Sequence, residues 1–206
     1  MLMAVECLPV VMTLLRKIMR LGEVAEVRMG YPFRSRVKHD PAGNVVVIQM
    51  KDIDEQNNLH ADEATRVSLA GRIDRHLLLC GDLIFRSRGA SNSAALVAAD
   101  LGDAVLASPL ILIRAREVLP AYLQWFINSQ KTQAKLTSLA VGTSVMMIST
   151  DILKDLEVPV PSLIDQQRIA EIASLSLRED VLMARLAEQR RRLTERVLMT
   201  YVKDAR

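Results

Sequence analysis

A chain of 206 residues can bury the core of one ordinary domain and still carry an appendage beside it. Half of its residues are hydrophobic and a quarter are charged, which excludes an intrinsically disordered chain. The net charge of +3 is too small to indicate nucleic-acid binding by itself, so the distribution of the charge must decide that question.

We expect no export signal in residues 1–20. The apolar run over residues 7–15 is too short to span a bilayer, and its basic residues follow the run, whereas those of a signal peptide precede it. Cys7 and Cys80 match no metal-ligand spacing, which indicates two free thiols in a reducing cytoplasm. We therefore expect a cytoplasmic protein without a membrane segment. Residues 1–20 are either an amphipathic segment against the core or an extension from a start codon placed too early.

Short β-type runs separated by turn residues begin at Leu21. Their regular spacing predicts a compact, mostly antiparallel β core. The expected strands cover residues 24–29, 30–36, 44–50, 65–69, 82–86, 94–98 and 110–114.

Helical signals follow the strands. Pro120 suits the first turn of a helix over residues 121–129, where Tyr122, Trp125 and Phe126 share one face that we expect to pack in the core. Gly142 is expected to end the next helix, and residues 149–151 offer N-caps for a short helix over 152–156.

A domain boundary is predicted at residues 158–161, where two prolines disfavour a helix. Ser162 and Asp165 then resemble a capping box, and neither Pro nor Gly occurs from there to Tyr201. The fold class is therefore α+β. We expect a β-rich domain with small helices over residues 21–161, followed by one long C-terminal coiled-coil helix over residues 162–206.

One face of this long helix keeps to coiled-coil spacing, interrupted by Glu179 and Gln189, while the other faces carry mixed charge of the kind found on solvated surfaces. A narrow apolar stripe of this length needs a second helix to cover it, and a second copy of the chain is the simplest supplier. The predicted seam of a homodimer consists of Ile172, Leu175, Leu182, Leu186, Leu193 and Val197.

The sequence contains no phosphate-binding glycine loop, no dinucleotide fingerprint and no methyltransferase tetrapeptide. Its three histidines have no ligand-like spacing. We therefore expect no cofactor, no metal and no catalytic residue. One alternative is a metal-dependent nuclease that uses Asp40, Gln49 and Lys51, although an amide is a poor magnesium ligand unless nearby acidic residues converge with it.

Two clusters of basic residues indicate DNA binding. The first lies within residues 27–39, which contain no acidic residue, and the second directly follows a predicted strand, with Arg72, Arg75 and His76 adding to it. Arginines at strand ends can contact phosphates and read guanine edges, although ordinary surface arginines would give the same pattern. The predicted DNA-binding residues are Arg34, Arg36, Lys38, Arg86 and Arg88.

The order of the motifs resembles the specificity subunit of type I restriction-modification systems. Its central block is Gly-Asp-Leu-Ile-Phe-Arg-Ser-Arg-Gly at residues 81–89. The other blocks lie at residues 21–27, 30–33, 47–53, 122–129, 142–145, 156–161 and 166–170, so that the resemblance spans about residues 21–200.

This resemblance implies a non-catalytic subunit that reads one DNA half-site per recognition domain, with paired helices that fix the spacing. A methyltransferase subunit and a restriction subunit would be its partners and would supply the chemistry. Full-length members carry two recognition domains and two such helices, whereas this chain has one of each. The resemblance therefore implies that two copies pair, or that the chain is a fragment or the partner of another half. A coiled-coil adaptor without a DNA role is the remaining alternative.

Overall fold

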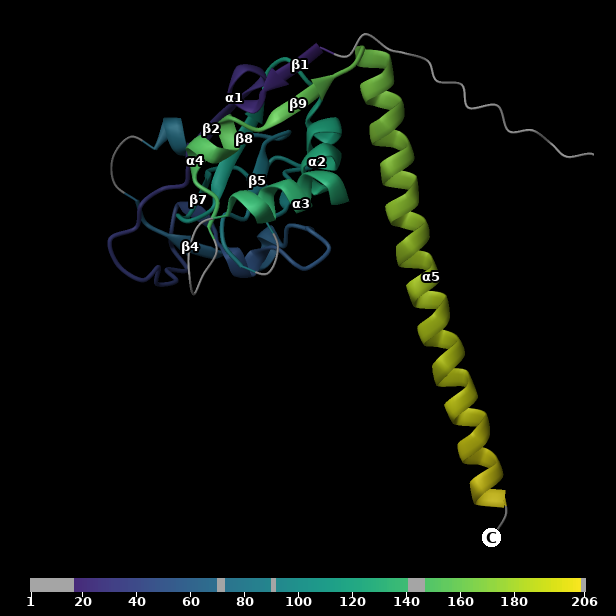
Figure 1. The fold of residues 1–206 in the computed structure, drawn as a ribbon. Coiled ribbons are helices and arrows are strands. Elements are labelled where there is room, and N and C mark those ends of the chain that lie inside the picture. Colours follow the sequence, from purple (N-terminus) through teal and green to yellow (C-terminus); the bar gives the residue numbers. More distant parts are fainter. Residues whose placement is uncertain (1–16, 70–72, 90–91, 141–146, 205–206) are drawn as a thin grey trace, which may run out of the picture. The chain divides into compact units, whose positions relative to one another are not determined.

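The computed structural model describes residues 17–69, 73–89, 92–140 and 147–204 (Figure 1). The chain divides into two compact units, Met1–Gln166 and Gln167–Arg206. The first unit is a β-rich domain with small helices, and the second is most of one long helix, so the predicted α+β fold class is confirmed. None of the helices in the described ranges is both long enough and apolar enough to cross a membrane.

A four-stranded sheet forms the centre of the domain, with strands in the order β2, β8, β5 and β6. Every neighbouring pair in it is antiparallel. Because β8 lies between β2 and β5 and is antiparallel to both, β2 and β5 run in the same direction and end at the same edge of the sheet. The four strands are β2 (Ala25–Met29), β8 (Ile111–Ala115), β5 (Leu83–Phe85) and β6 (Ala94–Leu96).

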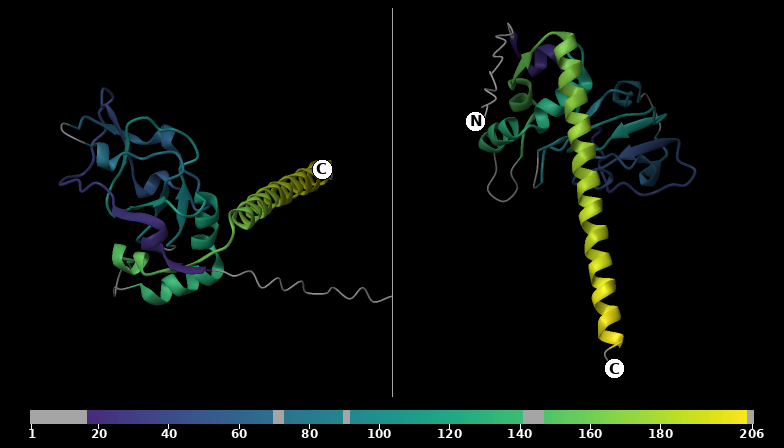
Figure 2. Two further views of the ribbon diagram at one scale, coloured as in Figure 1. Left: turned by 90° about the horizontal axis from the view of Figure 1, so that it is seen from above. Right: turned by 90° about the vertical axis from the view of Figure 1, so that its right-hand side faces the viewer.

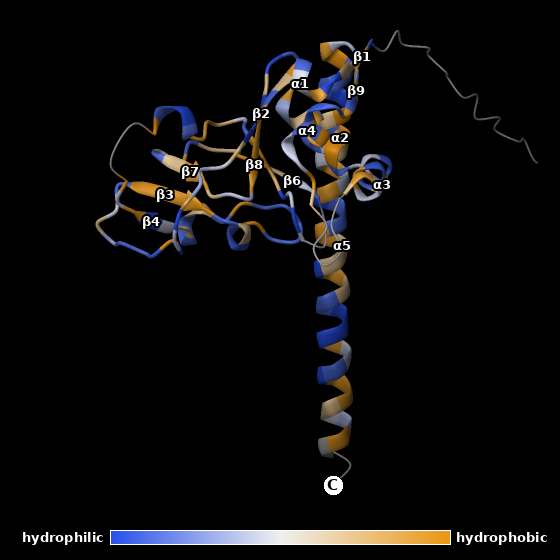
Figure 3. Ribbon diagram, turned by 60° about the vertical axis from the view of Figure 1, so that its left-hand side comes forward, coloured by the Kyte–Doolittle hydropathy of each residue, from blue (hydrophilic) through white to orange (hydrophobic). Residues whose placement is uncertain are grey.

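A second sheet has three strands, in the order β4 (Thr65–Val67), β3 (Val45–Ile48) and β7 (Ala104–Leu106). All four residues of β3 are β-branched and buried, as is typical of a strand covered on both faces. It appears uniformly hydrophobic in Figure 3. Strand β7 pairs with β3 in parallel, and the sequence analysis did not predict it.

Between the two sheets lies an apolar cluster that includes Ile48 of β3, Ile84 of β5 and Leu112 of β8. A second cluster covers the other face of the three-stranded sheet and includes Val45, Val47 and Val105. The alternation of side chains along β3 thus divides its residues between two cores.

Helices pack beside the four-stranded sheet: α2 (Pro120–Asn128) contacts β6 and β8, and α4 (Thr150–Lys154) contacts β2. The predicted aromatic face of α2 is only partly correct. Tyr122 is buried, but Trp125 is 39% exposed, because the buried face of the helix is completed by Leu123 and Ile127. The remaining helical segments are α1 (Leu21–Val24), α3 (Gln130–Leu139) and the short 3-10 turns Met50–Asp52, Ala61–Glu63 and Asp74–His76.

A two-stranded sheet joins distant parts of the chain, because β1 (Lys17–Arg20) pairs antiparallel with β9 (Glu157–Val160). The last four residues of the predicted N-terminal extension therefore form a strand of the domain. Residues 158–160, which were predicted only as a boundary, form part of its partner. Pro159 is tolerated because β9 has one neighbouring strand only.

The long helix α5 (Leu163–Asp204) has 42 residues and is unbroken along its length (Figure 1; Figure 2). As predicted, Ser162 caps its start: the Asp165 backbone N–H donates to the Ser162 hydroxyl, which in turn donates to the Asp165 carboxylate. At 1.5 Å per residue the helix is about 63 Å long. Apolar and polar residues alternate along it in Figure 3.

Candidate nucleic-acid interface

The predicted strand over residues 30–36 is instead a loop that carries the first basic cluster. Only Tyr31 forms a single bridge, to Ala107, and the chain then runs without regular structure to Asp40. Gly30 begins the loop where the backbones are too close for a side chain, since a Cβ there would lie 2.8 Å from the carbonyl oxygen of Leu106. The loop is therefore tied to the strand ends at its first residue.

Three apolar side chains anchor the loop to the domain. Tyr31, Phe33 and Val37 pack against the cluster beneath the three-stranded sheet. The Tyr31 ring lies 4.9 Å from the Phe33 ring and 5.2 Å from the His76 ring. Partial burial, together with the charges of Arg28 and Arg75, lowers the pKa of His76. His76 is therefore neutral at pH 7 and adds no charge to the cluster.

Between and beside these anchors, Arg34, Arg36 and Lys38 are exposed. None of the three has a hydrogen bond or ion pair with any part of the chain that the structure describes. Since Phe33 and Val37 anchor the backbone of the loop, the three cationic side chains project from an ordered segment. An anchored loop loses less conformational entropy when a ligand binds than a flexible loop does.

The two arginines of the second basic cluster, Arg86 and Arg88, have different environments. Arg88 is exposed, and its Nε donates to the Met147 sulfur. Arg86 is half-buried and donates to protein acceptors, namely the Ser93 hydroxyl, the Asn57 side-chain oxygen and the backbone oxygen of Asp54. Arg86 therefore joins the loop after β5 to the loop that contains Asp54 and Asn57.

That second loop is tightly hydrogen-bonded. Asn57 has a positive φ of 64°, and the Asp54 carboxylate accepts hydrogen bonds from the Asn58 backbone and side chain and from His60. Burial alone would raise the pKa of Asp54, but these hydrogen bonds outweigh it and lower the pKa to about 2. The carboxylate is therefore ionised at neutral pH and holds the loop closed.

The two basic segments leave the four-stranded sheet at the same edge. Met29 at the end of β2 and Phe85 at the end of β5 both pair with Ile111 of β8. One strand thus separates the two exits, which places them roughly 10 Å apart at the usual strand spacing. This arrangement leaves both clusters close enough to contact one duplex, and their joint role in DNA binding stays a prediction.

The residues of the nuclease alternative have structural roles instead. The Ser68 hydroxyl and the Ala42 N–H donate to Asp40 and lower the pKa of its carboxyl, while the Gln49 amide donates to the Thr65 hydroxyl. Lys51 lies 3.7 Å from the Asp52 carboxylate, whose other oxygen accepts the Gln49 N–H. Within the described ranges, no three His, Cys, Asp or Glu side chains converge as a metal site.

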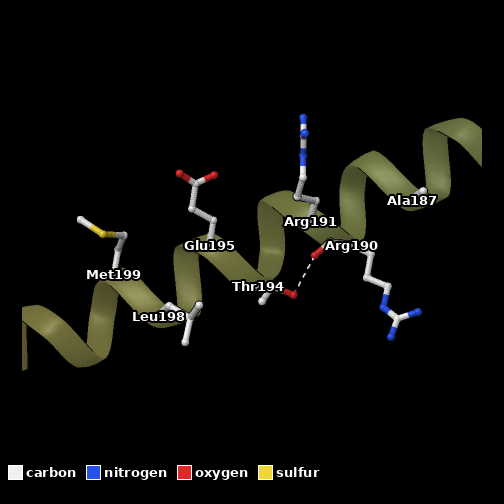
Figure 4. A pocket seen from close by; sticks show the side chains of 7 residues that line it. All are labelled: Ala187, Arg190, Arg191, Thr194, Glu195, Leu198 and Met199. Atoms are coloured by element: carbon white, nitrogen blue, oxygen red, sulfur yellow. Dashed lines mark hydrogen bonds between the residues drawn. The ribbon is translucent and has the colours of Figure 1, made fainter.

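A shallow groove on α5 also has no catalytic character (Figure 4). All seven residues that line it belong to the same helix, and Figure 4 shows their side chains diverging from that helix. A single helix cannot enclose a ligand, so the groove is ordinary helix surface. Its residues are Ala187, Arg190, Arg191, Thr194, Glu195, Leu198 and Met199.

Comparison with protein families gives a match over most of the chain. The model of the type I restriction modification DNA specificity domain matches residues 16–179. The chain belongs to this family. Its domain is therefore a specificity domain, a non-catalytic component of restriction-modification systems.

Solved structures share the fold of this specificity domain. The HsdS subunit from Thermoanaerobacter tengcongensis has a TM-score of 0.60 at 20% identity, over 81% of this chain and 38% of that one. The S subunit of a type I restriction-modification system from M. genitalium has a TM-score of 0.54 at 16% identity, over 82% and 40%. A chain from a study of complex assembly and conformational transition of the type I R-M system has a TM-score of 0.63 at 18% identity, over 82% and 40%.

This chain thus spans about two fifths of the length of those solved chains. No curated protein matches it. At these identities the structural likeness establishes the fold of the specificity domain only.

Sequence reasoning missed one buried ion pair of the specificity domain. The Asp82 carboxylate accepts two hydrogen bonds of 2.7 Å from Arg114 and one from the Leu79 N–H. Its side chain is only 2% exposed. The pair fixes the start of β5 against the end of β8, at the opposite end of these strands from the basic segments. No local signal could have found it, because 32 residues separate the partners.

Gln166 is a second structural residue that was not singled out. It is buried, its side-chain oxygen accepts the Leu119 N–H at the start of α2, and its amide donates to the Pro161 carbonyl. The family block at residues 166–170 therefore begins with a residue that ties the first turn of α5 to the rest of its own unit.

Proposed function

We propose that this chain reads one DNA half-site as a specificity subunit of a type I restriction-modification system and performs no chemistry itself. Membership of the specificity-domain family supports DNA recognition as the role. The observation that carries the proposal at residue level is the anchored loop with Arg34, Arg36 and Lys38, which are exposed and without protein partners in the described ranges. Three such cations on an anchored loop can contact the regularly spaced phosphates of a DNA duplex.

The proposed roles of the basic residues differ. Arg34, Arg36, Lys38 and Arg88 contact DNA directly, because they are exposed. Arg86 acts through the loops that it joins, since its guanidinium already donates to Ser93, Asn57 and Asp54. Its contribution to DNA binding is to hold these loops at the edge of the sheet where the other cations lie.

The proposed partners are double-stranded DNA, a methyltransferase subunit, a restriction subunit and a second copy of the chain, in the cytoplasm. The chain spans about two fifths of the solved chains it resembles, so two copies would supply two recognition domains and two long helices. The exposed apolar face of α5 supports pairing through that helix. The partner subunits would supply methyl transfer and cleavage.

The test measures DNA binding by the complex with the methyltransferase subunit over a range of salt concentrations. Changing Arg34, Arg36 and Lys38 together to Ala should weaken binding about 10- to 100-fold and flatten the log-log salt dependence by roughly 0.9 for each lost phosphate contact. The control removes the same charge from the helices α3 and α4, at Lys131, Lys135 and Lys154.

The two sets of variants give distinct outcomes. The control variant should bind DNA as the parent does, because its lysines lie on helices and not on the basic loop. If both variants lose DNA affinity equally, the loss reflects net charge alone, and the loop can no longer be assigned a role in DNA binding. Absence of DNA binding by the parent complex would favour the adaptor alternative.

A further inference from the structure

A tight turn at residues 54–57 carries two exposed polar side chains that take no part in holding the fold together. Glu55 and Gln56 form the tip of the turn, and both are exposed. Within the part of the chain that the structure describes, neither side chain has a hydrogen-bond or ion-pair partner. The turn therefore presents one carboxylate and one amide to the solvent.

The turn lies at the edge of the domain from which both basic segments leave. Just after β7, Ala107 forms a bridge with Tyr31 of the first basic segment and donates its N–H to the Ile48 carbonyl at the end of β3, the strand that precedes the turn. In the second basic segment, Arg86 donates to two oxygens of the turn itself, at 3.2 and 2.7 Å. The turn and the two basic segments are thus neighbours at one edge.

Hydrogen bonds hold the backbone of the turn in one conformation. Ile53 and Leu59 pair on either side of it, so that the turn closes a short two-stranded ribbon. The Asn57 N–H donates to the Asp54 carbonyl at 3.1 Å, and the Asp54 carboxylate accepts hydrogen bonds from the Asn58 backbone and side chain. An ordered turn loses less conformational entropy on binding than a flexible one does.

The charge at the tip excludes a role in phosphate binding. The phosphates of a duplex repel a carboxylate, so Glu55 would weaken DNA binding unless it accepted a hydrogen bond from another part of the duplex. The major groove offers such donors, namely the amino groups of cytosine and adenine. This groove is about 12 Å wide and admits a two-stranded ribbon, whereas the minor groove is only about 6 Å wide.

We infer that the turn enters the major groove, where Glu55 accepts a hydrogen bond from the amino group of a cytosine and Gln56 pairs with an adenine at a neighbouring position. The inference rests on the proposed function and names the residues that read bases within it. A carboxylate is complementary to the amino edge of cytosine, and an amide to the paired donor and acceptor of adenine.

This assignment separates base reading from phosphate binding. The basic loop with Arg34, Arg36 and Lys38 contacts phosphates, which orients the domain on the duplex but carries no sequence information. Arg86 is a positioning residue, because it holds the turn through two of its oxygens. The sequence preference at two positions of the half-site then depends on Glu55 and Gln56 alone.

Selection of bound duplexes from a random DNA library tests the inference, with the full chain in complex with the methyltransferase subunit. Sequencing of the bound duplexes gives the base preference at each position of the half-site. Glu55→Gln should lower the preference for a G·C pair at one position about tenfold, and Gln56→Ala should lower the preference for an A·T pair at a neighbouring position about as much. Glu55→Gln should bind non-target DNA at least as tightly as the parent, since it removes a negative charge.

Two controls accompany the turn variants. Glu117→Gln makes the same chemical change at an exposed residue beyond the end of β8, at the opposite end of the strands from the turn, and should leave every base preference unchanged. Changing Arg34, Arg36 and Lys38 together to Ala should weaken binding to all sequences but keep the base preferences of the parent.

The other outcomes overturn the inference. An unchanged preference in either turn variant would remove that residue from base reading, and a loss confined to A·T pairs in Glu55→Gln would contradict its pairing with cytosine. A uniform loss of affinity without a changed preference would mean that the turn contributes to structure only. If the parent complex selects no sequence, the proposed function fails together with the inference. If the parent selects a half-site and both turn variants select the same one, only the assignment of the turn fails.

Discussion

Changing Asp82 to Ala removes the buried acceptor that holds the start of β5 to the end of β8. The carboxylate accepts two hydrogen bonds from Arg114 and one from the Leu79 N–H, and only 2% of the side chain is exposed. The substitution leaves the Arg114 guanidinium and the Leu79 N–H without this acceptor. The Arg114 side chain also donates to the Leu77 carbonyl, so it retains one partner.

The expected loss of stability follows from the burial of the two partners. Breaking a fully buried ion pair by removing one partner costs about 3 to 5 kcal/mol. Because the Arg114 side chain is 28% exposed, water can solvate part of the stranded charge, and we expect a smaller loss of about 2 to 3 kcal/mol. For a protein of this size, that corresponds to a Tm lower by roughly 5 to 10 °C.

Thermal and urea unfolding of the full chain measure the effect. The matched control is Asp155→Ala, which breaks the Arg20–Asp155 ion pair, where both side chains are about 70% exposed. That change should cost no more than about 0.5 kcal/mol. If Asp82→Ala is no less stable than Asp155→Ala, or if a double-mutant cycle with Arg114→Ala gives no coupling, the reasoning from burial is refuted.

Three further predictions concern the basic edge. Arg86→Ala should destabilise the domain by about 2 kcal/mol in urea unfolding, because it leaves several hydrogen-bond acceptors unpaired. Arg88→Ala should lower the stability by less than about 0.5 kcal/mol and should weaken DNA binding instead. Equal stabilities of the two variants would contradict this division. The pKa of Asp54 is lowered on folding, so its contribution to the stability of the loop is complete above about pH 4 and is lost as the pH falls towards 2. Hydrogen exchange of the loop amides should show this loss. The variant Asp54→Asn should abolish the pH dependence of that exchange. Gly30→Ala should lower the Tm by several degrees, since its Cβ would lie 2.8 Å from the Leu106 carbonyl oxygen; an unchanged Tm would show that the strand ends can separate.

Much of the architecture could be predicted from local sequence. The absence of Pro and Gly after Ser162, with the capping pair Ser162 and Asp165, predicted α5 almost to the residue. The β-branched run at residues 45–48 predicted β3, and Pro120 predicted the start of α2. These features depend on backbone propensity and capping, which act over a few residues and are therefore readable in sequence.

The roles of the candidate site residues required tertiary structure. Arg86 and Arg88 are two residues apart and chemically identical, yet Arg86 joins two loops while Arg88 is exposed. Two of the partners of Arg86, Asn57 and Asp54, are 29 and 32 residues away along the chain. No local sequence pattern distinguishes an arginine that will donate hydrogen bonds to such acceptors from one that will be exposed to solvent.

The arrangement of the strands was likewise decided by long-range pairing. The sequence predicted several strands, but not that β2 and β5 would flank β8 and release both basic segments at one edge. Nor did it predict that residues 17–20 would pair with β9 across almost the whole domain. Strand order depends on which hydrogen-bonding edges meet when distant apolar faces are buried together, and that information belongs to the folded chain as a whole.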